Sequence, residues 1–326
     1  MTAMGVMNGC NLQSGTFSLG SRQFELYVPP GVAPNAPLML VWHGIASDPQ
    51  VIEGKMQFKP KANANGFILA YPVGTGIPKA FNGAGCCAQS SLGTTQNDMQ
   101  FGKDIVTFLT QTNTRANRNN VFTTGFSNGD YPTIYFLCVL VCVCVFFFFV
   151  MIFVTCVLSG GFMSHLLACE AGFQANGKPW FKAFATHSGL MGGNYTCPHT
   201  QGKVPFMTFH GDDDNIVGID GRGTLNTIFK SLSVVVAEWT VLFDFFVVVV
   251  LLSSVLTFDH NQAANGCSGE TVENTYGSDT TKCVKYVGCD VEECIVSGGL
   301  GHNWSGEPGL HGTPHPIHEC ACVVCL

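Results

Sequence analysis

Residues 119–129, NNVFTTGFSNG, determine how the rest of the chain is interpreted. A short β-branched run ends there in the pentapeptide G-x-S-x-G, whose central residue is Ser127. This pattern is typical of a nucleophile elbow, a sharp strand-to-helix turn that holds its serine at strained backbone angles. Glycines flank such a serine because the strand and the helix approach each other closely. The stretch therefore predicts a strand before Ser127, a nucleophilic hydroxyl on it, and a helix directly behind it.

The residues behind the pentapeptide do not have the pattern of that helix. After Asp130, an apolar tract runs from Tyr131 to Leu158, and a second apolar tract covers residues 232–257. Since a helix of about 20 apolar residues crosses a bilayer, hydropathy alone makes both tracts candidate membrane spans. Neither tract, however, has the asymmetric Lys and Arg flanks that orient a span, and both contain homopolymeric blocks such as FFFF and VVVV.

Each tract also interrupts a segment that is continuous without it. Without residues 130–160, GFSNG joins GFMSHLLACE, which restores the helix that the elbow needs. Without residues 232–257, TLNTIFKS joins FDHNQAANGC in one amphipathic pattern. We therefore predict that both tracts are insertions of translated non-coding sequence, such as retained introns. The alternative is two genuine spans, or an inactive, membrane-associated product.

The remaining segments alternate between strand and helix patterns. Continuous apolar runs of strand length predict buried strands, and apolar residues at helical spacing predict helices. The predicted strands are residues 15–29 (two short strands), 38–44, 67–71, 121–124, 181–186, 204–209 and a run that starts at 293; the predicted helices are residues 49–64, 98–112, 160–172 and 221–231. This order predicts one α/β domain over residues 15–306, with a mostly parallel sheet between helices, followed by an irregular tail at residues 307–326.

The charge and the cysteine content of the chain indicate which kinds of partner and which cellular compartment are expected. Only 11% of the 326 residues are charged and the net charge is −7, which argues against nucleic acid or an anionic membrane surface as a partner. Sixteen cysteines indicate an oxidising compartment, and sequons at Asn194 and Asn303 are compatible with secretion. The first ten residues contain no basic segment followed by an apolar one, so no signal peptide is visible. Either the true start lies upstream or the protein is not secreted.

Three polar groups follow predicted strands in the order that a hydrolase triad requires. Ser127 comes first, the acidic cluster Asp212 to Asp214 second, and His302 third, which is the chain order of the α/β-hydrolase triad. In such a triad the imidazole takes the proton of the serine, and the acid orients the imidazole and stabilises its charged form. His43 and His210 compete with His302 as the base, but each stands before a glycine at a strand end, where the turn accounts for it.

An oxyanion hole needs backbone N–H groups. One expected donor is the N–H of Asn128, directly after the nucleophile, and the other is the N–H of Ile45, in the loop after an early strand. The cysteines are interpreted as disulfide partners. The tail also carries residue types that bind zinc, but nothing around them predicts a folded site, so no metal is expected; these residues are His318, Cys320, Cys322 and Cys325.

Taken together, the motifs resemble one family of secreted esterases, the feruloyl esterases and poly(3-hydroxybutyrate) depolymerases. The resemblance extends over about residues 17–306 and rests on LVWHG, AYPVG, FNGAGCC, NDMQF, VFTTGFSNG, MSHLLACE, FHGDDDNIV, NGC and GGLGHNW. It implies an α/β-hydrolase fold that cleaves carboxylic esters with neither a metal nor an organic cofactor. It also implies disulfides among eight cysteines, namely Cys86, Cys87, Cys169, Cys197, Cys267, Cys283, Cys289 and Cys294.

The same resemblance assigns the site residues. It implies Ser127 as the nucleophile, the last acid of the cluster, Asp214, as the triad acid, and His302 as the base, with His43 and Trp304 at the substrate. It implies a secreted, monomeric serine esterase that cleaves hydroxycinnamoyl esters on plant cell-wall polysaccharide such as xylan. Polyhydroxybutyrate or acetylxylan esters are the alternative substrates, because the acyl pocket is not legible from the sequence.

The chain departs from the family pattern in a few places. Asp130 and the first apolar tract stand where the family continues with a glycine and a helix, and Ser305 stands where proline is common. The family's closing helix and secretion signal have no counterpart in the sequence.

Overall fold

The structure, a computed structural model, describes residues 12–83, 96–111, 116–126, 160–200, 204–223, 229–240, 271–275, 281–287 and 290–297. The strands are β1 (Gly15–Leu19), β2 (Arg22–Tyr27), β3 (Ala36–Trp42), β4 (Ile68–Pro72), β5 (Ala116–Phe126), β6 (Ala183–His187), β7 (Phe206–Gly211), β8 (Thr271–Thr275), β9 (Thr281–Tyr286) and β10 (Val291–Val296). The helices are α1 (Pro49–Met56), α2 (Phe58–Asn65), α3 (Asp98–Leu109), α4 (Gly160–Glu170) and α5 (Leu232–Thr240).

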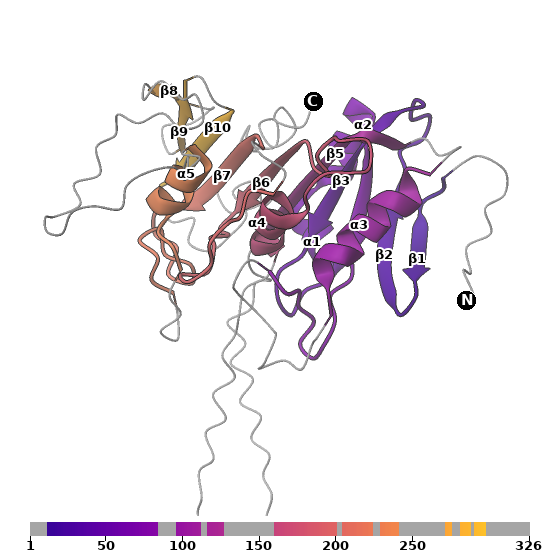
Figure 1. The fold of residues 1–326 in the computed structure, drawn as a ribbon, viewed down its shortest axis with the longest axis horizontal. Helices are drawn as coiled ribbons and strands as arrows, with labels where there is room; N and C mark the ends of the chain where they lie inside the picture. The colour runs from indigo at the N-terminus through magenta and orange to yellow at the C-terminus, as the bar shows by residue number, and fades with distance from the viewer. Residues whose placement is uncertain are drawn as a thin grey trace, which may run out of the picture.

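The ten strands form one sheet in the order β1-β2-β4-β3-β5-β6-β7-β10-β9-β8 (Figure 1). Its central strands, from β4 through β3, β5, β6 and β7 to β10, are parallel. The β1–β2 pair adds to one edge and the β9–β8 pair to the other, both antiparallel to their neighbours. The mostly parallel sheet that the sequence predicts is therefore confirmed.

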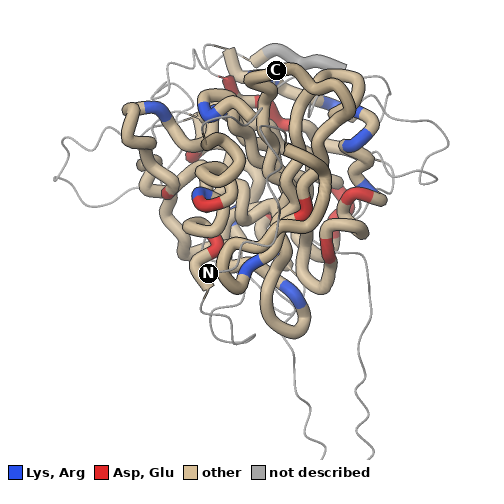
Figure 2. The backbone as a smooth tube through the Cα atoms, turned by 90° about the vertical axis from the view of Figure 1, so that its right-hand side faces the viewer, with Lys and Arg blue, Asp and Glu red and all other residues tan. Residues whose placement is uncertain are grey.

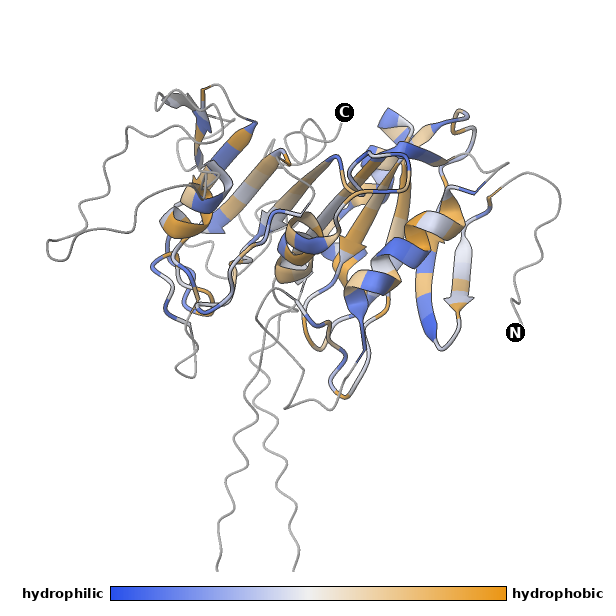
Figure 3. Cartoon of the chain, in the orientation of Figure 1, coloured by the Kyte–Doolittle hydropathy of each residue, from blue (hydrophilic) through white to orange (hydrophobic). Residues whose placement is uncertain are grey.

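Helices cover both faces of this sheet. Met39 and Val41 of β3 pack in a core with α1 and α2, whereas Leu38, Leu40 and Trp42 pack on the opposite face with α3 and α4. Because both faces of β3 are buried, its sequence is continuously apolar instead of alternating. The same concentration of hydrophobic residues on the central strands is visible in Figure 3.

The segment predicted as one helix over residues 49–64 forms two. Asp48 accepts hydrogen bonds from the backbone N–H groups of Gln50 and Val51, at 3.0 and 2.9 Å, and so caps the start of α1. Gln57 has left-handed backbone angles, which end α1 and turn the chain into α2. A run of apolar spacing cannot reveal a single left-handed residue, so the prediction of one continuous helix is wrong at Gln57.

Helix α5 occupies the first nine residues of the second apolar tract. Its Val235 and Trp239 are buried, and the Trp239 indole donates to Nδ1 of His165 on α4 at 3.3 Å. The predicted helix over residues 221–231 is wrong in its described part, because residues 221–223 and 229–231 are not helical. None of the helices described is long and apolar enough to cross a membrane. Residues 130–159 and 241–257 of the two tracts lie outside the described part of the chain.

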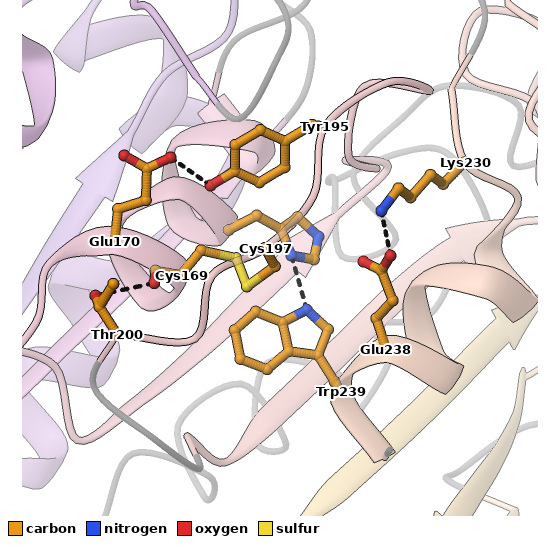
Figure 4. Close-up of a disulfide and its surroundings, with 9 residues drawn as sticks. Cys169, Glu170, Tyr195, Cys197, Thr200, Lys230, Glu238 and Trp239 are labelled. Carbon is orange, nitrogen blue, oxygen red and sulfur yellow. Dashed lines mark hydrogen bonds and ion pairs between the residues drawn. A yellow bond between two sulfur atoms is a disulfide. The ribbon is translucent and has the colours of Figure 1, made fainter. Parts of the chain in front are cut away.

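Two disulfides join parts of the fold, and all four cysteines belong to the predicted set. Cys169, near the end of α4, is bonded to Cys197 in the segment after β6, and Cys283 of β9 is bonded to Cys294 of β10. Around the first bond, Tyr195 donates to Glu170 at 2.7 Å, and Lys230 forms an ion pair with Glu238 (Figure 4). The other four predicted cysteines lie outside the described residues.

Few charges lie inside the fold. Figure 2 shows acidic and basic residues scattered among long neutral stretches of the described chain. The ion pair between Arg22 and Asp98 is buried: Arg22 Nη2 of β2 lies 2.6 Å from Asp98 Oδ1 at the start of α3, and the second Asp98 oxygen accepts from the Asn82 N–H at 2.8 Å. Burial raises the pKa of Asp98, and the adjacent Arg22 guanidinium opposes that change. The pair therefore links the start of β2 to the start of α3.

Candidate active site

The predicted site residues follow four parallel strands at one edge of the sheet. β3, β5, β7 and β10 all run in the same direction, with β6 between β5 and β7, and their carboxyl ends are close in register. In open α/β sheets, ligands bind at this edge. The sequence places Ile45 after β3, Ser127 and Asn128 after β5, Asp214 after β7, and His302 with Trp304 after β10. Ser127, Asn128, His302 and Trp304 lie outside the described residues, whereas Ile45, His43 and Asp214 lie within them.

The end of β5 and the start of α4 touch, backbone against backbone. A Cβ atom on Gly125 would lie 2.2 Å from the Gly160 carbonyl oxygen, and a Cβ on Gly160 would lie 2.1 Å from the Phe126 carbonyl oxygen. Gly161 is also packed closely against Gly189, after β6: a Cβ on Gly161 would lie 2.8 Å from the Gly189 Cα. Side chains at these positions would separate strand and helix. This close approach is what a nucleophile elbow requires of its strand and helix.

The loop after β3 is fixed by His43, whose two ring nitrogens both bond to backbone atoms of the described chain. Nδ1 lies 2.6 Å from the Gly44 carbonyl oxygen, and Nε2 lies 3.0 Å from the Gly74 backbone N–H in the loop after β4. A backbone N–H can only donate, so Nε2 is the acceptor and Nδ1 carries the proton. The ring is fully buried, and this burial lowers the pKa of His43 to about 4. His43 is therefore neutral at neutral pH.

The loops after β3 and β4 are bonded to each other at a second place. The Ala46 N–H donates to the Lys79 carbonyl at 2.8 Å, and the β4 loop closes on itself through two bonds between Thr75 and Ala80, at 3.0 and 2.9 Å. Ile45, the expected oxyanion donor, lies between His43 and Ala46 and is buried. The backbone on both sides of Ile45 is thus held in place by hydrogen bonds to the loop after β4.

The loop after β7 holds Asp214 in a tight turn. Asp214 Oδ1 accepts from the N–H groups of Ile216 and Val217, both at 2.9 Å, and the Asp214 N–H donates to Gly211 at 3.3 Å. His210, at the end of β7, donates from Nε2 to the Val217 carbonyl at 2.6 Å, and the same nitrogen lies 3.5 Å from Asp214 Oδ2. The two bonds on Oδ1 fix the direction of the whole carboxylate, and Oδ2 lies on the side of His210.

Burial distinguishes the three acids of this cluster. Asp212 and Asp213 are exposed, whereas Asp214 is buried. A triad acid needs a fixed orientation, and the buried Asp214 carboxylate has one because two backbone N–H groups bond to it. The geometry therefore favours Asp214 over its neighbours, in agreement with the family resemblance. Its role as the triad acid stays a prediction.

The two competing histidines both bond to backbone carbonyls, and His210 Nε2 also lies 3.5 Å from Asp214 Oδ2. His43 bonds to Gly44 and Gly74, and His210 bonds to Val217, so both rings fasten the loop that follows their strand. From the sequence, the two His-Gly pairs are attributed to the turns that follow their strands. The structure gives a reason, because each ring is buried and bonded to the backbone of the turn after its strand. His302 stays the predicted base.

The sequence interpretation missed two residues at the end of β6, between β5 and β7. Ser188 has a positive φ of 49°, its Oγ lies 3.2 Å from Nδ1 of His187, and its N–H donates to the Phe209 carbonyl at 2.9 Å. The His187 ring lies 5.3 Å from that of Phe126, the residue before Ser127. The available signal was the Ser188-Gly189 pair directly after a predicted strand, which marks a sharp turn.

A cluster of metal-ligand residue types in the described part of the chain is not a metal site. Cys283, Glu292 and Cys294 bring their ligand atoms close together. The two sulfurs are, however, bonded to each other in a disulfide, so they offer no thiolate to a metal ion.

The chain was compared with known proteins in sequence and in structure. No family model matches the chain. In sequence, a bifunctional acetylxylan esterase/xylanase of Neocallimastix patriciarum is 29% identical over 108 residues, which are 33% of this chain and 14% of that protein. In structure, an acetyl xylan esterase from Aspergillus awamori is similar with a TM-score of 0.53 at 15% identity, over 90% of this chain and 91% of that one. The LpqC poly(3-hydroxybutyrate) depolymerase from Bordetella parapertussis has a TM-score of 0.39 at 16% identity, over 62% and 67% of the two chains.

These comparisons support the fold most strongly. The match to the fungal relative takes in only 14% of its length, and the LpqC score is too low to support an argument. The likeness to the Aspergillus structure, together with the strand order, shows that the chain has the α/β-hydrolase fold. The fold that the sequence motifs imply is therefore confirmed.

Proposed function

We propose that the protein is a serine carboxylic-ester hydrolase with Ser127, His302 and Asp214 as its catalytic triad. The observation that supports this most is the Asp214 turn, a buried carboxylate fixed by two backbone N–H groups at the carboxyl end of β7. Its neighbour β10 leads along the chain to His302, and β5 leads directly to Ser127. The three residue types therefore follow strands of one parallel sheet, at the edge where such folds bind ligands.

The chemistry proceeds in two halves through an acyl-enzyme. Ser127 Oγ attacks the ester carbonyl carbon while His302 takes the hydroxyl proton, and the oxyanion accepts hydrogen bonds from the N–H groups of Ile45 and Asn128. The alcohol leaves with the proton from His302, which leaves an ester of Ser127. A water molecule then attacks that ester, gives a proton to His302, and releases the carboxylic acid as the proton returns to Ser127. Asp214 orients the imidazole and stabilises its charged form throughout.

The proposal also specifies which class of ester the protein cleaves. The fungal relative and the Aspergillus structure are both acetylxylan esterases by name, which favours small acyl groups on xylan. The sequence motifs resemble feruloyl esterases, which favours hydroxycinnamoyl esters on the same kind of polysaccharide. We therefore propose an ester of plant cell-wall xylan as the substrate, with acetyl as the first acyl group to test and feruloyl as the second. Polyhydroxybutyrate is a third arm of the same test.

The test is hydrolysis of 4-nitrophenyl acetate by the purified chain and by Ser127→Ala. The triad predicts that Ser127→Ala reduces kcat on the order of a million-fold, to the background rate. Substrate preference follows from kcat/KM for acetylated xylan, methyl ferulate and a hydroxybutyrate oligomer under the same conditions. Hydrolysis that persists unchanged in Ser127→Ala would overturn the proposal.

We also propose that α4 is the helix of the elbow and that residues 130–159 are an insertion between the two. The support is the backbone contact between Phe126 and Gly160, which are neighbours in space although a long apolar tract separates them in sequence. The sequence predicts a second insertion over residues 232–257, but its first nine residues form α5, which packs into the core, so we propose the shorter range 241–257. Sequencing the transcript tests this directly: the expected message lacks both tracts, and a mature message that encodes them contradicts it.

An extracellular location follows as part of the same proposal. Both described disulfides are buried, Cys283–Cys294 between two strands and Cys169–Cys197 beside α4, and bonds of this kind persist in oxidising compartments. A cell-wall polysaccharide is also met outside the cell. Fractionation of a producing culture tests the location, and a protein found only inside cells would contradict it.

A further inference from the structure

The peptide group between Gly44 and Ile45 joins two facts about the β3 loop. Its carbonyl oxygen belongs to Gly44 and accepts the proton of His43 Nδ1 at 2.6 Å. Its N–H belongs to Ile45 and is the donor expected in the oxyanion hole. In a planar trans peptide the C=O and the N–H point in opposite directions. A bond that fixes the direction of the Gly44 carbonyl therefore also fixes the direction of the Ile45 N–H.

The ring that makes this bond is itself fixed from behind. Nε2 of His43 accepts the Gly74 N–H at 3.0 Å, and the ring packs 4.6 Å from that of Phe81. Gly74 has no side chain, and a Cβ there would lie 2.9 Å from the Ala80 carbonyl and 3.0 Å from Cε1 of His43. The absence of a side chain thus lets the β4 loop come close enough to hold the ring. His43 is thus anchored to the loop after β4, whereas the peptide that it orients belongs to the loop after β3.

The peptide on the other side of Ile45 is also held. The Ala46 N–H donates to the Lys79 carbonyl at 2.8 Å, so the β4 loop fixes both ends of the short segment. The two peptide planes that flank Ile45 are therefore each fastened by one hydrogen bond, one to the His43 ring and one to the loop that anchors this ring. Preorganised donors of this kind lower a barrier because they need not reorient during the reaction.

We propose that His43 is a positioning residue that sets the direction of the Ile45 N–H in the oxyanion hole. The inference rests on the proposed function, because that direction matters to catalysis only in an acyl-transfer site. It places His43 behind the donor loop, on the backbone, as distinct from a contact with substrate. The fully buried ring is consistent with this placement.

Two conservative variants separate the bond to Gly44 from the bond to Gly74. The side-chain amide nitrogen of asparagine lies about where Nδ1 of histidine does, so His43→Asn keeps a donor for the Gly44 carbonyl and loses the acceptor for Gly74. Glutamine places its amide oxygen about where Nε2 lies, so His43→Gln keeps the acceptor and loses the donor. The proposal expects kcat for 4-nitrophenyl acetate to stay within about threefold in His43→Asn and to fall by about 10- to 100-fold in His43→Gln, with KM nearly unchanged.

His165→Gln is the matched control. His165 is also fully buried, and both of its ring nitrogens are engaged: Nε2 bonds to the Gly189 carbonyl and Nδ1 accepts from the Trp239 indole. It lies in α4, and its ring packs against those of Phe184, Phe206 and Trp239. Its loss is expected to lower the unfolding midpoint as much as His43→Gln does, while kcat per folded molecule stays unchanged. A purely structural role for His43 would instead make kcat follow stability in all three variants.

Amide hydrogen exchange gives a readout that does not depend on activity. In His43→Gln the Ala46 amide, which is bonded to the Lys79 carbonyl, is expected to exchange about tenfold faster than in the unaltered protein, and in His43→Asn it is expected to stay protected. If Ser127→Ala keeps full activity, the proposed function fails while the exchange rates still test the loop. Equal exchange in both variants, or a larger loss of kcat in His43→Asn than in His43→Gln, would overturn the inference.

Discussion

The ends of β3 and β7 carry the same dipeptide and use it differently. His43-Gly44 follows β3 and His210-Gly211 closes β7, and in each case a fully buried imidazole bonds to a backbone carbonyl at 2.6 Å. The His43 bond reaches the very next residue, and its other nitrogen reaches a different loop at Gly74. The His210 bond spans its own loop to Val217, beside the Asp214 carboxylate.

The difference shows where each loop gets its rigidity. The functional group that we propose for the β3 loop is a backbone N–H, which cannot orient itself and depends on a side chain to hold its peptide plane. The functional group that we propose for the β7 loop is the side chain of Asp214, which bonds directly to two N–H groups of its own turn. We therefore expect the β3 loop to be sensitive to its histidine and the β7 loop to be sensitive to its acid.

The largest effect is expected at the acid. Asp214→Asn keeps the size of the side chain but removes the charge that stabilises an imidazolium, so kcat should fall about 10⁴-fold. Asp213→Asn is the matched control, since it changes an exposed acid one residue away and should leave kcat within about twofold. Steady-state kinetics on 4-nitrophenyl acetate checks both. Equal effects of the two substitutions would show that Asp214 is not the triad acid.

A smaller effect is expected from the histidine of the same loop. His210→Asn should lower kcat by no more than about tenfold, because the two N–H bonds to Asp214 remain, while the buried Val217 carbonyl loses the Nε2 donor at a cost of about 1–3 kcal/mol in the free energy of unfolding. Urea unfolding and kcat measured on one preparation separate the two. A loss of kcat as large as that of Asp214→Asn would contradict the comparison, since it would mean that the turn cannot hold the acid alone.

The smallest expected effect is on the pH dependence of stability. Burial lowers the pKa of His43 to about 4 and that of His165 to about 3, whereas both titrate near 6.5 in an unfolded chain. The unfolded state therefore binds protons first as the pH falls, so the stability from these neutral rings is complete above pH 6.5 and declines toward pH 4 and below. Urea midpoints at pH 7.5, 5.5 and 4.5 should fall less steeply in His43→Asn than in the unaltered protein. Identical slopes would argue against a neutral, buried His43.

The parallel centre of the sheet could be predicted because its strands are buried on both faces. Continuous apolar runs such as Leu38 to Trp42 carry a strong signal, and each is followed by turn residues. The break between α1 and α2 could not be predicted, because it depends on the left-handed angles of the single residue Gln57. The position of α5 inside an apolar tract was also hidden, since composition alone does not show that Val235 and Trp239 meet a core surface.

Chain order predicted which residue types follow which strands, but it could not predict what holds them. Choosing Asp214 within its cluster depended on family resemblance, and the turn bonds that favour it physically are visible only in the fold. The bond from His43 to Gly74 joins two loops that are distant in sequence, so no local pattern announces it. Ser188 was missed because the turn that it makes after β6 depends on a positive φ.

The most direct test of a serine hydrolase built on this fold is active-site labelling. The intact protein is incubated with a fluorophosphonate, which forms a covalent adduct with an activated serine, and the adduct is located by mass spectrometry. The account predicts one adduct per molecule, on Ser127, which is lost in Ser127→Ala and formed much more slowly in Asp214→Asn. Labelling at another serine, or none in a protein that hydrolyses esters, would contradict the assignment of Ser127 as the nucleophile.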